Sequence, residues 1–406
     1  MSTANETRNP GHPPFLSTVL WMFFWVILLT PSSLVHDRDG HQDQTPTPRR
    51  DAIWRFDLRS AGYAGSASRK EQWGFHLRPQ PICFSGDDLV ATFITRENIT
   101  TLTHRDQPDD SRPLRLHGVF LDAQTGKIST IKEWSISRPG GGIIPVGHGE
   151  FAVLTPAMLA LYSPNGDMLK QLRLSSKQEA SLWDLYSSPS GASILAEYHY
   201  PEVSLEWIDT ASLEVKQTWN DFLPGVSISD VELAFPKETY FESQKFTTHE
   251  VLIRGLIAPL RTFCKVRIGW EDDEGCGYPQ FISNDLISLW GPHGLALFRR
   301  TGEPVSRISF PKDEWIGSIL YPSADGNRIA VTVWTHKGGS EVFDVSWHSV
   351  LKRVIVYDIP SRQWTYVLDA KKQKLRDISG LALSPDGSLI GILADGVVEV
   401  YRISAP

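Results

Sequence analysis

The sequence predicts an all-β protein, a seven-bladed β-propeller made of four-stranded antiparallel blades. The chain has 406 residues with 31 Gly and 27 Pro, and so many turn-forming residues indicate many short strands rather than long helices. Two kinds of turn recur along the chain at intervals of about forty to fifty residues, which is the period of a four-stranded blade. Short apolar stretches follow turns of the first kind, and 41% of the residues are hydrophobic, enough for a large core.

Each unit is expected to have one turn between its first two strands and a second turn between its last two. Turns of the first kind combine Ser, Pro, Asp, Asn and Gly, as in Ser384–Gly387. They are expected at 85–88, 147–150, 188–191, 236–238, 283–285, 323–326 and 384–387. Turns of the second kind are expected at 122–126, 163–166, 209–213, 300–302 and 358–362. Apolar strands such as Leu89–Ile94 and Leu389–Ala394 follow the first kind, which gives seven units.

Two of the seven units are longer than the others. The first contains the insertion Thr95–Pro113, and the sixth contains the insertion Thr335–Lys352. Both insertions are expected between the second and third strands, so both should leave the ring on the same face. The fourth unit, about Val226 to Gly275, is irregular, and the sequence does not assign its strands.

The seventh unit lacks a fourth strand in the sequence that follows it. Its third strand ends at Tyr401–Ile403, close to the last residue, whereas Ala52–Leu58 alternates in the manner of a strand. We therefore expect Ala52–Leu58 to pair with the last blade and to close a propeller that spans residues 51–406. Such closure protects the strand edges that an open array would expose.

The amino-terminal residues are read separately from the propeller. Phe15–Thr30 contains no charged residue, and its sixteen positions would span about 24 Å as a helix, less than a bilayer core of about 30 Å. Residues 1–35 are therefore predicted to be either a signal peptide or an amino-terminal membrane anchor, with a buried helix as the alternative. Residues 36–50 are polar and contain two prolines, which predicts a disordered linker. The propeller is thus expected to be exported, in an extracellular or periplasmic location, with or without an anchor.

The chain has three cysteines, Cys83, Cys264 and Cys276, and no Cys-x-x-Cys pair that would indicate a zinc or redox motif. Cys264 and Cys276 are close enough in sequence to form a disulfide in an oxidising compartment. Two separate buried thiols are the alternative. Cys83 is expected to be a free residue of the core.

Two small sets of residues are candidates for a binding site. Glu197 and His199 lie at the end of a second strand, where they could face the mouth of the ring, although a hydrogen-bonded scaffold role is the simpler interpretation. The other set flanks the insertion of the sixth unit, where aromatic residues on long loops suit a binding surface. This set consists of Trp334, His336, Trp347 and His348. Packing of the insertion against its own blade would explain the same residues. The sequence predicts neither a metal site nor a cofactor.

The repeat resembles those of WD40-like and YVTN-type seven-bladed propellers over about residues 51–406. The resemblance depends on the Ser-Pro-Asp-Gly turn at Ser384–Gly387 and on third strands that end in an apolar residue and Asp, as at Leu121-Asp122 and Tyr357-Asp358. No unit has the paired Gly-His and Trp-Asp dipeptides of true WD40 repeats. The overall pattern is similar to secreted bacterial propellers of unassigned function, so the resemblance implies a blade rather than an activity.

The sequence favours a non-catalytic exported scaffold that binds a protein, a peptide or a glycan. It contains no Gly-x-Ser-x-Gly elbow, no phosphate-binding Gly-rich loop and no His-Glu-x-x-His motif. The formal charge of −7 argues against a nucleic-acid partner, and the membrane is expected to be contacted only through the amino-terminal segment. The alternative is a propeller enzyme, of lyase, lactonase or glycosidase type, with His and carboxylates gathered at the central channel.

Overall fold

In a computed structural model, the chain divides into two compact units, Met1–Pro46 and Thr47–Pro406. The structure describes residues of the second unit, namely 51–58, 81–96, 114–136, 142–146, 149–155, 158–173, 182–198, 204–220, 226–241, 246–255, 260–269, 278–291, 294–311, 313–317, 320–336, 349–375, 378–394 and 396–403. The predicted signal or anchor segment (1–35) and linker (36–50) lie outside the described residues. None of the helices in the described part is long and apolar enough to cross a membrane.

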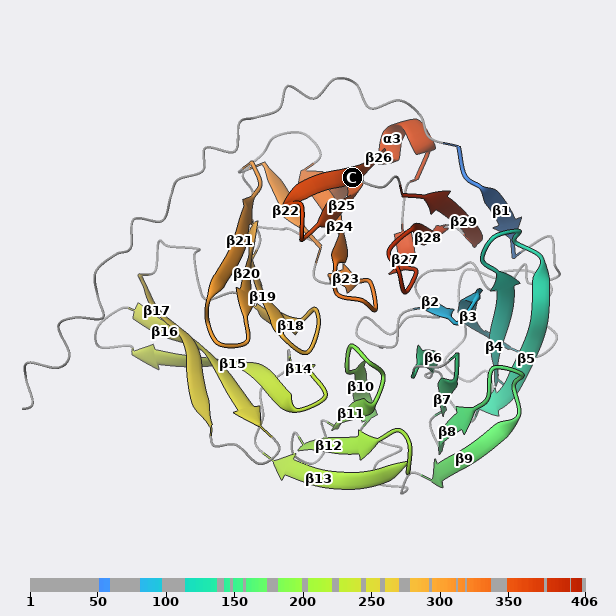
Figure 1. The fold of residues 1–406 in the computed structure, drawn as a ribbon, viewed down its shortest axis with the longest axis horizontal. Coiled ribbons are helices and arrows are strands. Elements are labelled where there is room, and N and C mark those ends of the chain that lie inside the picture. Colours follow the sequence, from blue (N-terminus) through green and yellow to red (C-terminus); the bar gives the residue numbers. More distant parts are fainter. Residues whose placement is uncertain are drawn as a thin grey trace, which may run out of the picture. The chain divides into compact units, whose positions relative to one another are not determined.

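The described residues form seven antiparallel sheets, which confirms the predicted seven-bladed propeller (Figure 1). Blade 1 consists of β2 (Ile82–Ser85), β3 (Asp88–Arg96), β4 (Leu114–Asp122) and β5 (Ile128–Ile136). Blade 2 consists of β6 (Gly142–Pro145), β7 (Phe151–Thr155), β8 (Met158–Tyr162) and β9 (Met168–Arg173). Blade 3 consists of β10 (Leu182–Ser187), β11 (Ser193–Tyr198), β12 (Ser204–Asp209) and β13 (Glu214–Asn220).

The next two blades repeat the same order of strands. Blade 4 consists of β14 (Ser227–Ile228), β15 (Glu232–Phe241), β16 (Phe246–Gly255) and β17 (Arg261–Gly269). Blade 5 consists of β18 (Tyr278–Phe281), β19 (Leu286–Gly291), β20 (Gly294–Arg299) and β21 (Pro304–Ser309).

Blade 6 differs in that its first strand is split in two. The pieces β22 (Glu314–Ile316) and β23 (Tyr321–Pro322) both pair with β24 (Arg328–His336). The blade continues with β25 (Ser349–Asp358) and β26 (Gln363–Asp369). A single-turn helix, α3 (Ala370–Gln373), follows β26, and the carboxylate of Asp369 caps it by accepting from the Lys372 N–H.

Blade 7 combines strands from opposite ends of the described chain. It contains β27 (Ile378–Leu383), β28 (Leu389–Ala394) and β29 (Val397–Arg402), and its outer strand is β1 (Trp54–Asp57). The pairing of β1 with β29 is antiparallel, with Trp54 opposite Val400 and Asp57 opposite Val397. The strand expected over residues 52–58 therefore lies at the outer edge of the last blade (Figure 1).

The hydrophobic core is divided among the spaces between neighbouring blades. Buried clusters join blades 1 and 2, 2 and 3, 3 and 4, 4 and 5, 5 and 6, 6 and 7, and 7 and 1, so the contacts close into a ring. A second strand such as β7 is buried along its whole length because a blade covers each of its faces. An outer strand such as β5 alternates between exposed and half-buried positions. This division explains why the inner strands read as continuous apolar runs.

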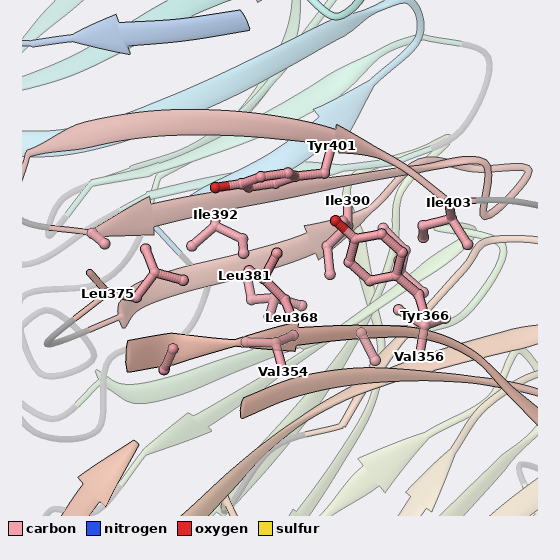
Figure 2. Packing of buried hydrophobic residues seen from close by; sticks show 14 of the residues in the cluster. Val354, Val356, Tyr366, Leu368, Leu375, Leu381, Ile390, Ile392, Tyr401 and Ile403 are labelled. Carbon is pink, nitrogen blue, oxygen red and sulfur yellow. The ribbon is translucent and has the colours of Figure 1, made fainter. Parts of the chain in front are cut away.

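Figure 2 shows one of these interfaces, between blades 6 and 7. Side chains of β25 and β26 point toward those of β27 and β28, and the cluster includes Tyr366 of β26 and Tyr401 of β29. Both tyrosines are about 2% exposed or less.

One predicted turn is wrong. Residues 236–238 were expected to form the first turn of the fourth unit, but Pro236 lies within β15, and the turn is at 229–231. The Ser229 N–H closes that turn by donating to the carbonyl of Glu232 (2.8 Å). Pro indicates a turn in most contexts. It is tolerated in a strand where no neighbouring strand requires a hydrogen bond from the N–H that Pro lacks. The Glu232 carbonyl points toward β14, and alternate residues of a strand point the same way, so the ladder to β16, where Pro236 lies opposite Val251, needs no N–H from Pro236.

Candidate functional site

The strand order gives the described propeller two unlike faces. Connections from a first to a second strand, and from a third to a fourth, emerge on one face, here called the turn face. Connections from a second to a third strand, and those between blades, emerge on the opposite face, here called the connection face. The two insertions follow β3 and β24, so the strand ends that flank them lie on the connection face, as predicted.

On the turn face, the inner turns of neighbouring blades contact one another. The Ser85 hydroxyl of blade 1 donates to the carbonyl of Gly149 in blade 2 (3.1 Å). The Ser190 hydroxyl of blade 3 donates to the carboxylate of Asp230 in blade 4 (2.7 Å). Similar hydrogen bonds join residues 230 and 284, 325 and 385, and 328 and 387. These contacts fix the spacing of the blades from one side of the ring.

One of these turns requires glycine for two reasons. Gly191 has a φ of +75°, a conformation that side chains with a Cβ rarely adopt. A Cβ at this position would also lie 2.5 Å from the backbone of Val146 in the preceding blade. The close approach of blades 2 and 3 therefore depends on the absence of a side chain.

The outer turns are held by aspartates that end the third strands. The Asp358 carboxylate accepts from the N–H and hydroxyl of Ser361 (2.9 and 2.6 Å) and pairs with Arg328 (3.2 Å). Burial raises the pKa of Asp358, but these hydrogen bonds outweigh burial and hold the pKa below its ordinary value. Asp122 accepts in the same way from Thr125, whose hydroxyl lowers the pKa of that carboxyl. An apolar residue followed by Asp at the end of a third strand thus marks an outer turn, which the Asp carboxylate stabilises by accepting hydrogen bonds.

The rim of the turn face carries a second set of contacts between blades. The indole N–H of Trp54, on the outer strand of blade 7, donates to the carbonyl of Ala123 in blade 1 (2.8 Å). Lys170 of blade 2 donates to the carbonyl of Ala211 in blade 3, and Arg261 of blade 4 donates to that of Arg300 (3.1 Å). The turn face is therefore engaged in holding the ring together.

The connection face is uneven because the blades differ in height. Second and third strands have 9 or 10 residues in blades 1, 4 and 6, but 5 or 6 in blades 2, 3, 5 and 7. The second strands begin directly after the inner turn and the third strands end at the outer turn, so the extra residues lie on the connection face. At about 3.3 Å per residue, these three raised hairpins rise roughly 10–16 Å above their neighbours.

Each of the three taller blades has a carboxylate that contacts two basic side chains. In blade 6, the Glu314 carboxylate accepts from both Nη atoms of Arg353 (3.1 and 2.5 Å) and from Lys352. The Glu314 side chain is 3% exposed and that of Arg353 is 12% exposed, whereas Lys352 reaches the surface at 41%. The group holds one more positive charge than negative.

Blade 4 repeats the arrangement across three strands. Lys237, Glu250 and Lys265 lie opposite one another on β15, β16 and β17. The Glu250 carboxylate lies 2.9 Å from the Lys265 ammonium and 3.9 Å from that of Lys237. Both lysines are more than half exposed, whereas Glu250 is 12% exposed.

In blade 1, Glu133 lies 3.3 Å from Arg115 and 3.1 Å from Nδ1 of His117. The imidazole of His117 stacks on Phe93 at a centroid distance of 5.0 Å. Burial lowers the pKa of His117, although Glu133 acts in the opposite direction. Among these three groups, two Lys or Arg side chains face one carboxylate in blades 4 and 6.

Of the residues predicted from the sequence, Glu197 lies in the interior. It is fully buried at the end of β11 and accepts the Tyr186 hydroxyl (2.7 Å). Tyr186 belongs to the cluster between blades 3 and 4, so the carboxylate is part of that interface. Its assignment as a binding residue stays a prediction. His199 lies outside the described residues.

Trp334 is half-buried on β24 and lies opposite Trp315. Its indole N–H donates to the Thr332 hydroxyl (3.0 Å), and it packs on the cluster between blades 6 and 7. His336 ends the same strand, but its side chain is outside the described part, as are Trp347 and His348. A binding surface formed by these four side chains thus stays a prediction.

The cysteine predictions have different outcomes. Cys83 is a free, buried thiol, and burial raises its pKa to about 12. Cys264, on the outer strand of blade 4, is disulfide-bonded. Cys276 lies outside the described residues, so its pairing with Cys264 stays a prediction.

Sequence reasoning missed the carboxylate and its two basic partners in each raised hairpin. Glu314 is 38 and 39 residues from Lys352 and Arg353, and no local pattern links them. Consecutive basic residues at the start of a third strand were the available signal in blade 6. Among the described residues, no three His, Cys, Asp or Glu side chains converge as a metal ion would require.

No protein-family model and no curated protein matches the chain. Among solved structures, one titled "Crystal Structure of Mitotic Checkpoint Complex" contains a similar chain, with 11% sequence identity and a TM-score of 0.48. The similarity covers 90% of this chain and 99% of that chain. A likeness of this degree does not bear on the partner or the activity of this chain.

Proposed function

We propose that this protein is a non-catalytic interaction scaffold that binds a protein or peptide partner on the connection face of its propeller. The difference between the two faces carries the proposal. Inner and outer turns on the turn face are used in contacts between blades, as at Ser85–Gly149 and Trp54–Ala123. The connection face instead has three raised hairpins between lower blades, and binding residues in proteins often lie on such protruding segments of a rigid scaffold.

Exposed positive charge in blades 4 and 6 also supports partner binding on the connection face. Lys237, Lys265 and Lys352 are each more than 40% exposed, while the carboxylates beside them are 12% exposed or less. Surface charge of this kind steers a partner of opposite charge and increases its association rate.

Charge reversal on each face tests the proposal. The full chain, its Lys237→Glu/Lys352→Glu variant and its Lys127→Glu/Arg362→Glu variant would be used to capture partners from an extracellular extract. Lys127 and Arg362 are exposed on the turn face and serve as the matched control. A partner retained by the native chain and the control, but lost by the connection-face variant, is expected. Equal capture by all three, or loss only in the control, would contradict the proposal.

We further propose that the propeller is exported, delivered by the charge-free segment Phe15–Thr30. The disulfide at Cys264 supports this, because disulfides persist mainly in oxidising compartments. Amino-terminal sequencing of the protein recovered outside the cytoplasm would distinguish a cleaved signal from a retained anchor. Recovery of all the protein in the cytoplasm, with Cys264 reduced, would refute export.

A further inference from the structure

Large apolar side chains of the described propeller are exposed mainly where its outer strands begin. Eleven such side chains are exposed in the described part of the chain. Seven of them lie at the first or second position of an outer strand, or directly before it, and they come from six of the seven blades. These rim residues are Ile53 of blade 7, Ile128 of blade 1, Met168 and Leu169 of blade 2, Val215 of blade 3, Leu260 of blade 4 and Trp364 of blade 6.

The rim residues surround the turn face. All outer strands begin on that face, and the blades close into a ring, so their first residues encircle it. The rim residues are 37–54% exposed. On the connection face, only Tyr278 and Val350 are exposed to a similar extent among the large apolar residues that the structure describes. Apolar residues scattered singly over a surface need no explanation, whereas repetition of one position in six blades indicates a shared contact.

The ring arrangement restricts the kind of surface that could cover these side chains. A partner that contacts all six blades at once must be broad and must accept apolar groups at shallow depth, as the interfacial region of a bilayer does. The inner turns, which the ring encloses, carry acidic residues. These are Asp87, Asp230, Asp285, Asp325 and Asp386. Anionic headgroups are therefore disfavoured at this face, and neutral ones suit it better.

The chain also enters the described propeller at the turn face. β1 is antiparallel to β29, with Trp54 opposite Val400. Because β29 ends on the turn face, β1 begins there, and Ile53 is itself a rim residue. Residues 31–50 connect this point to the charge-free segment Phe15–Thr30. Twenty residues of flexible coil span roughly 25 Å, so a membrane segment retained at 15–30 would hold the turn face close to the bilayer.

We propose that the turn face of the propeller rests on a lipid bilayer with neutral headgroups, with the rim residues inserted into the headgroup region. Burial of the rim residues supplies the affinity, and the tether at residues 31–50 raises the local concentration of the bilayer. The connection face then points away from the membrane. The inference goes beyond the expectation that only the amino-terminal segment contacts a membrane, and it does not require the partner proposed above.

The first test places a fluorescent label at separate points of the ring. The full chain on phosphatidylcholine vesicles carries nitrobenzoxadiazole on a cysteine introduced as Ile128→Cys, Val215→Cys or Leu260→Cys. Val350→Cys, on the connection face and 42% exposed, is the matched control. The native chain measures background labelling, which burial of the Cys83 thiol should keep low. We expect a nitroxide-labelled lipid to quench the three rim labels and aqueous iodide to quench only the control.

Two results of this test would overturn the proposal. Equal quenching of all four labels by iodide would show that the propeller is only tethered and does not lie on the membrane. Shielding of the rim labels from iodide in detergent solution without vesicles would show that two copies of the chain cover each other's turn faces instead.

The second test removes apolar side chains from the rim. Met168→Ser, Leu169→Ser and Leu260→Ser are combined in the chain labelled at Val215→Cys. Each of the three residues is about half exposed, so the fold should tolerate the change, and melting temperatures check this. The ratio of shielded to iodide-accessible label should fall about tenfold or more, because three partly buried apolar groups leave the bilayer. Unchanged shielding would overturn the proposal.

A matched control and the amino-terminal sequence complete the design. Tyr278→Ser/Val350→Ser removes two exposed apolar side chains from the connection face and should leave the shielding unchanged. An equal loss of shielding in this control would contradict the proposal. If amino-terminal sequencing shows that Phe15–Thr30 is removed as a signal peptide, the bilayer proposal is overturned, while the scaffold function still stands. Conversely, failure of the charge-reversal test refutes the scaffold function and leaves the bilayer proposal standing.

Discussion

Removal of β1, the strand that closes the ring, should destabilise the whole propeller. Trp54 is the main residue of this clasp: it is 9% exposed and packs in the cluster between blades 7 and 1. Its indole N–H also donates to the Ala123 carbonyl (2.8 Å), and its ring covers Gly126. The perturbation is therefore Trp54→Ala, with the exposed neighbour Ile53→Ala as the matched control.

The expected cost can be worked out from these contacts. Truncation of a buried Trp to Ala destabilises by about 3–5 kcal/mol, which includes the transfer and cavity terms. An unfolding entropy of about 2.1 cal/mol/K per residue over a unit of this size gives a shift of roughly 1.3 °C per kcal/mol. Trp54→Ala should therefore lower the melting temperature by about 4–7 °C. Ile53 is 37% exposed, and its truncation should change the melting temperature by about 1 °C or less.

Differential scanning calorimetry of the full chain gives the shift directly. Deletion of residues 52–58 should lower the melting temperature further, because it also removes the pairing with β29 and the buried Leu58. A Trp54→Ala variant that melts within about 1 °C of the native protein would refute the clasp. The same holds if Ile53→Ala has an effect as large.

Three further changes test how individual blades are held. Glu314→Gln leaves Arg353, whose side chain is only 12% exposed, without its counter-charge, and should cost about 3–5 kcal/mol in urea-unfolding experiments. Gly191→Ala should cost more than Gly302→Ala, although both have positive φ, because a Cβ meets backbone at 2.5 Å only at Gly191. The pKa of Asp358 is lower in the folded chain than its ordinary 3.8, so its stabilisation is present above about pH 4 and is lost as the pH falls through the folded value. Asp358→Asn should therefore lower the urea midpoint at pH 6, and the difference from the native chain should be smaller near pH 2.

Each of these predictions has a result that contradicts it. For Glu314, the control is Glu303→Gln on an exposed turn, and equal effects of the two substitutions would mean that burial of the ion pair is unimportant. For the glycines, a larger loss at Gly302 would contradict the steric argument, because no atom lies within 4 Å of a Cβ there. For Asp358, the same difference from the native midpoint at both pH values would show that its ionisation does not stabilise the fold.

Much of the architecture follows from local sequence patterns. Turns such as Ser384–Gly387 and Asp358–Arg362 depend on hydrogen bonds within five residues, so their residues identify them without a structure. The insertions were placed between second and third strands because the turns on either side of them were recognised. In blade 4 the same reasoning failed at Pro236, since a proline in a strand and a proline in a turn look alike until the partner strand is known.

The candidate site could be anticipated only in part. Trp334 lies beside the insertion of blade 6, as its sequence position implies, but its indole N–H bonds to Thr332 in its own strand. Glu314, Lys352 and Arg353 were not selected, although the Glu314 carboxylate is only 3% exposed and contacts both bases. Glu314 on β22 meets the two bases on β25 only because both strands pair with β24. The sequence alone does not show that pairing.

The sequence by itself determined the repeat, the apolar inner strands and the origin of the closing strand near Trp54, because each is encoded by the spacing of residues close together in the chain. Only the tertiary structure decided that three hairpins rise above the connection face, that Pro236 lies inside a strand, and that carboxylates and bases from separate strands gather there. These features depend on where each strand stops relative to its neighbours. Partner strands lie tens of residues away, and pairing across that distance is set by packing between blades rather than by local preference.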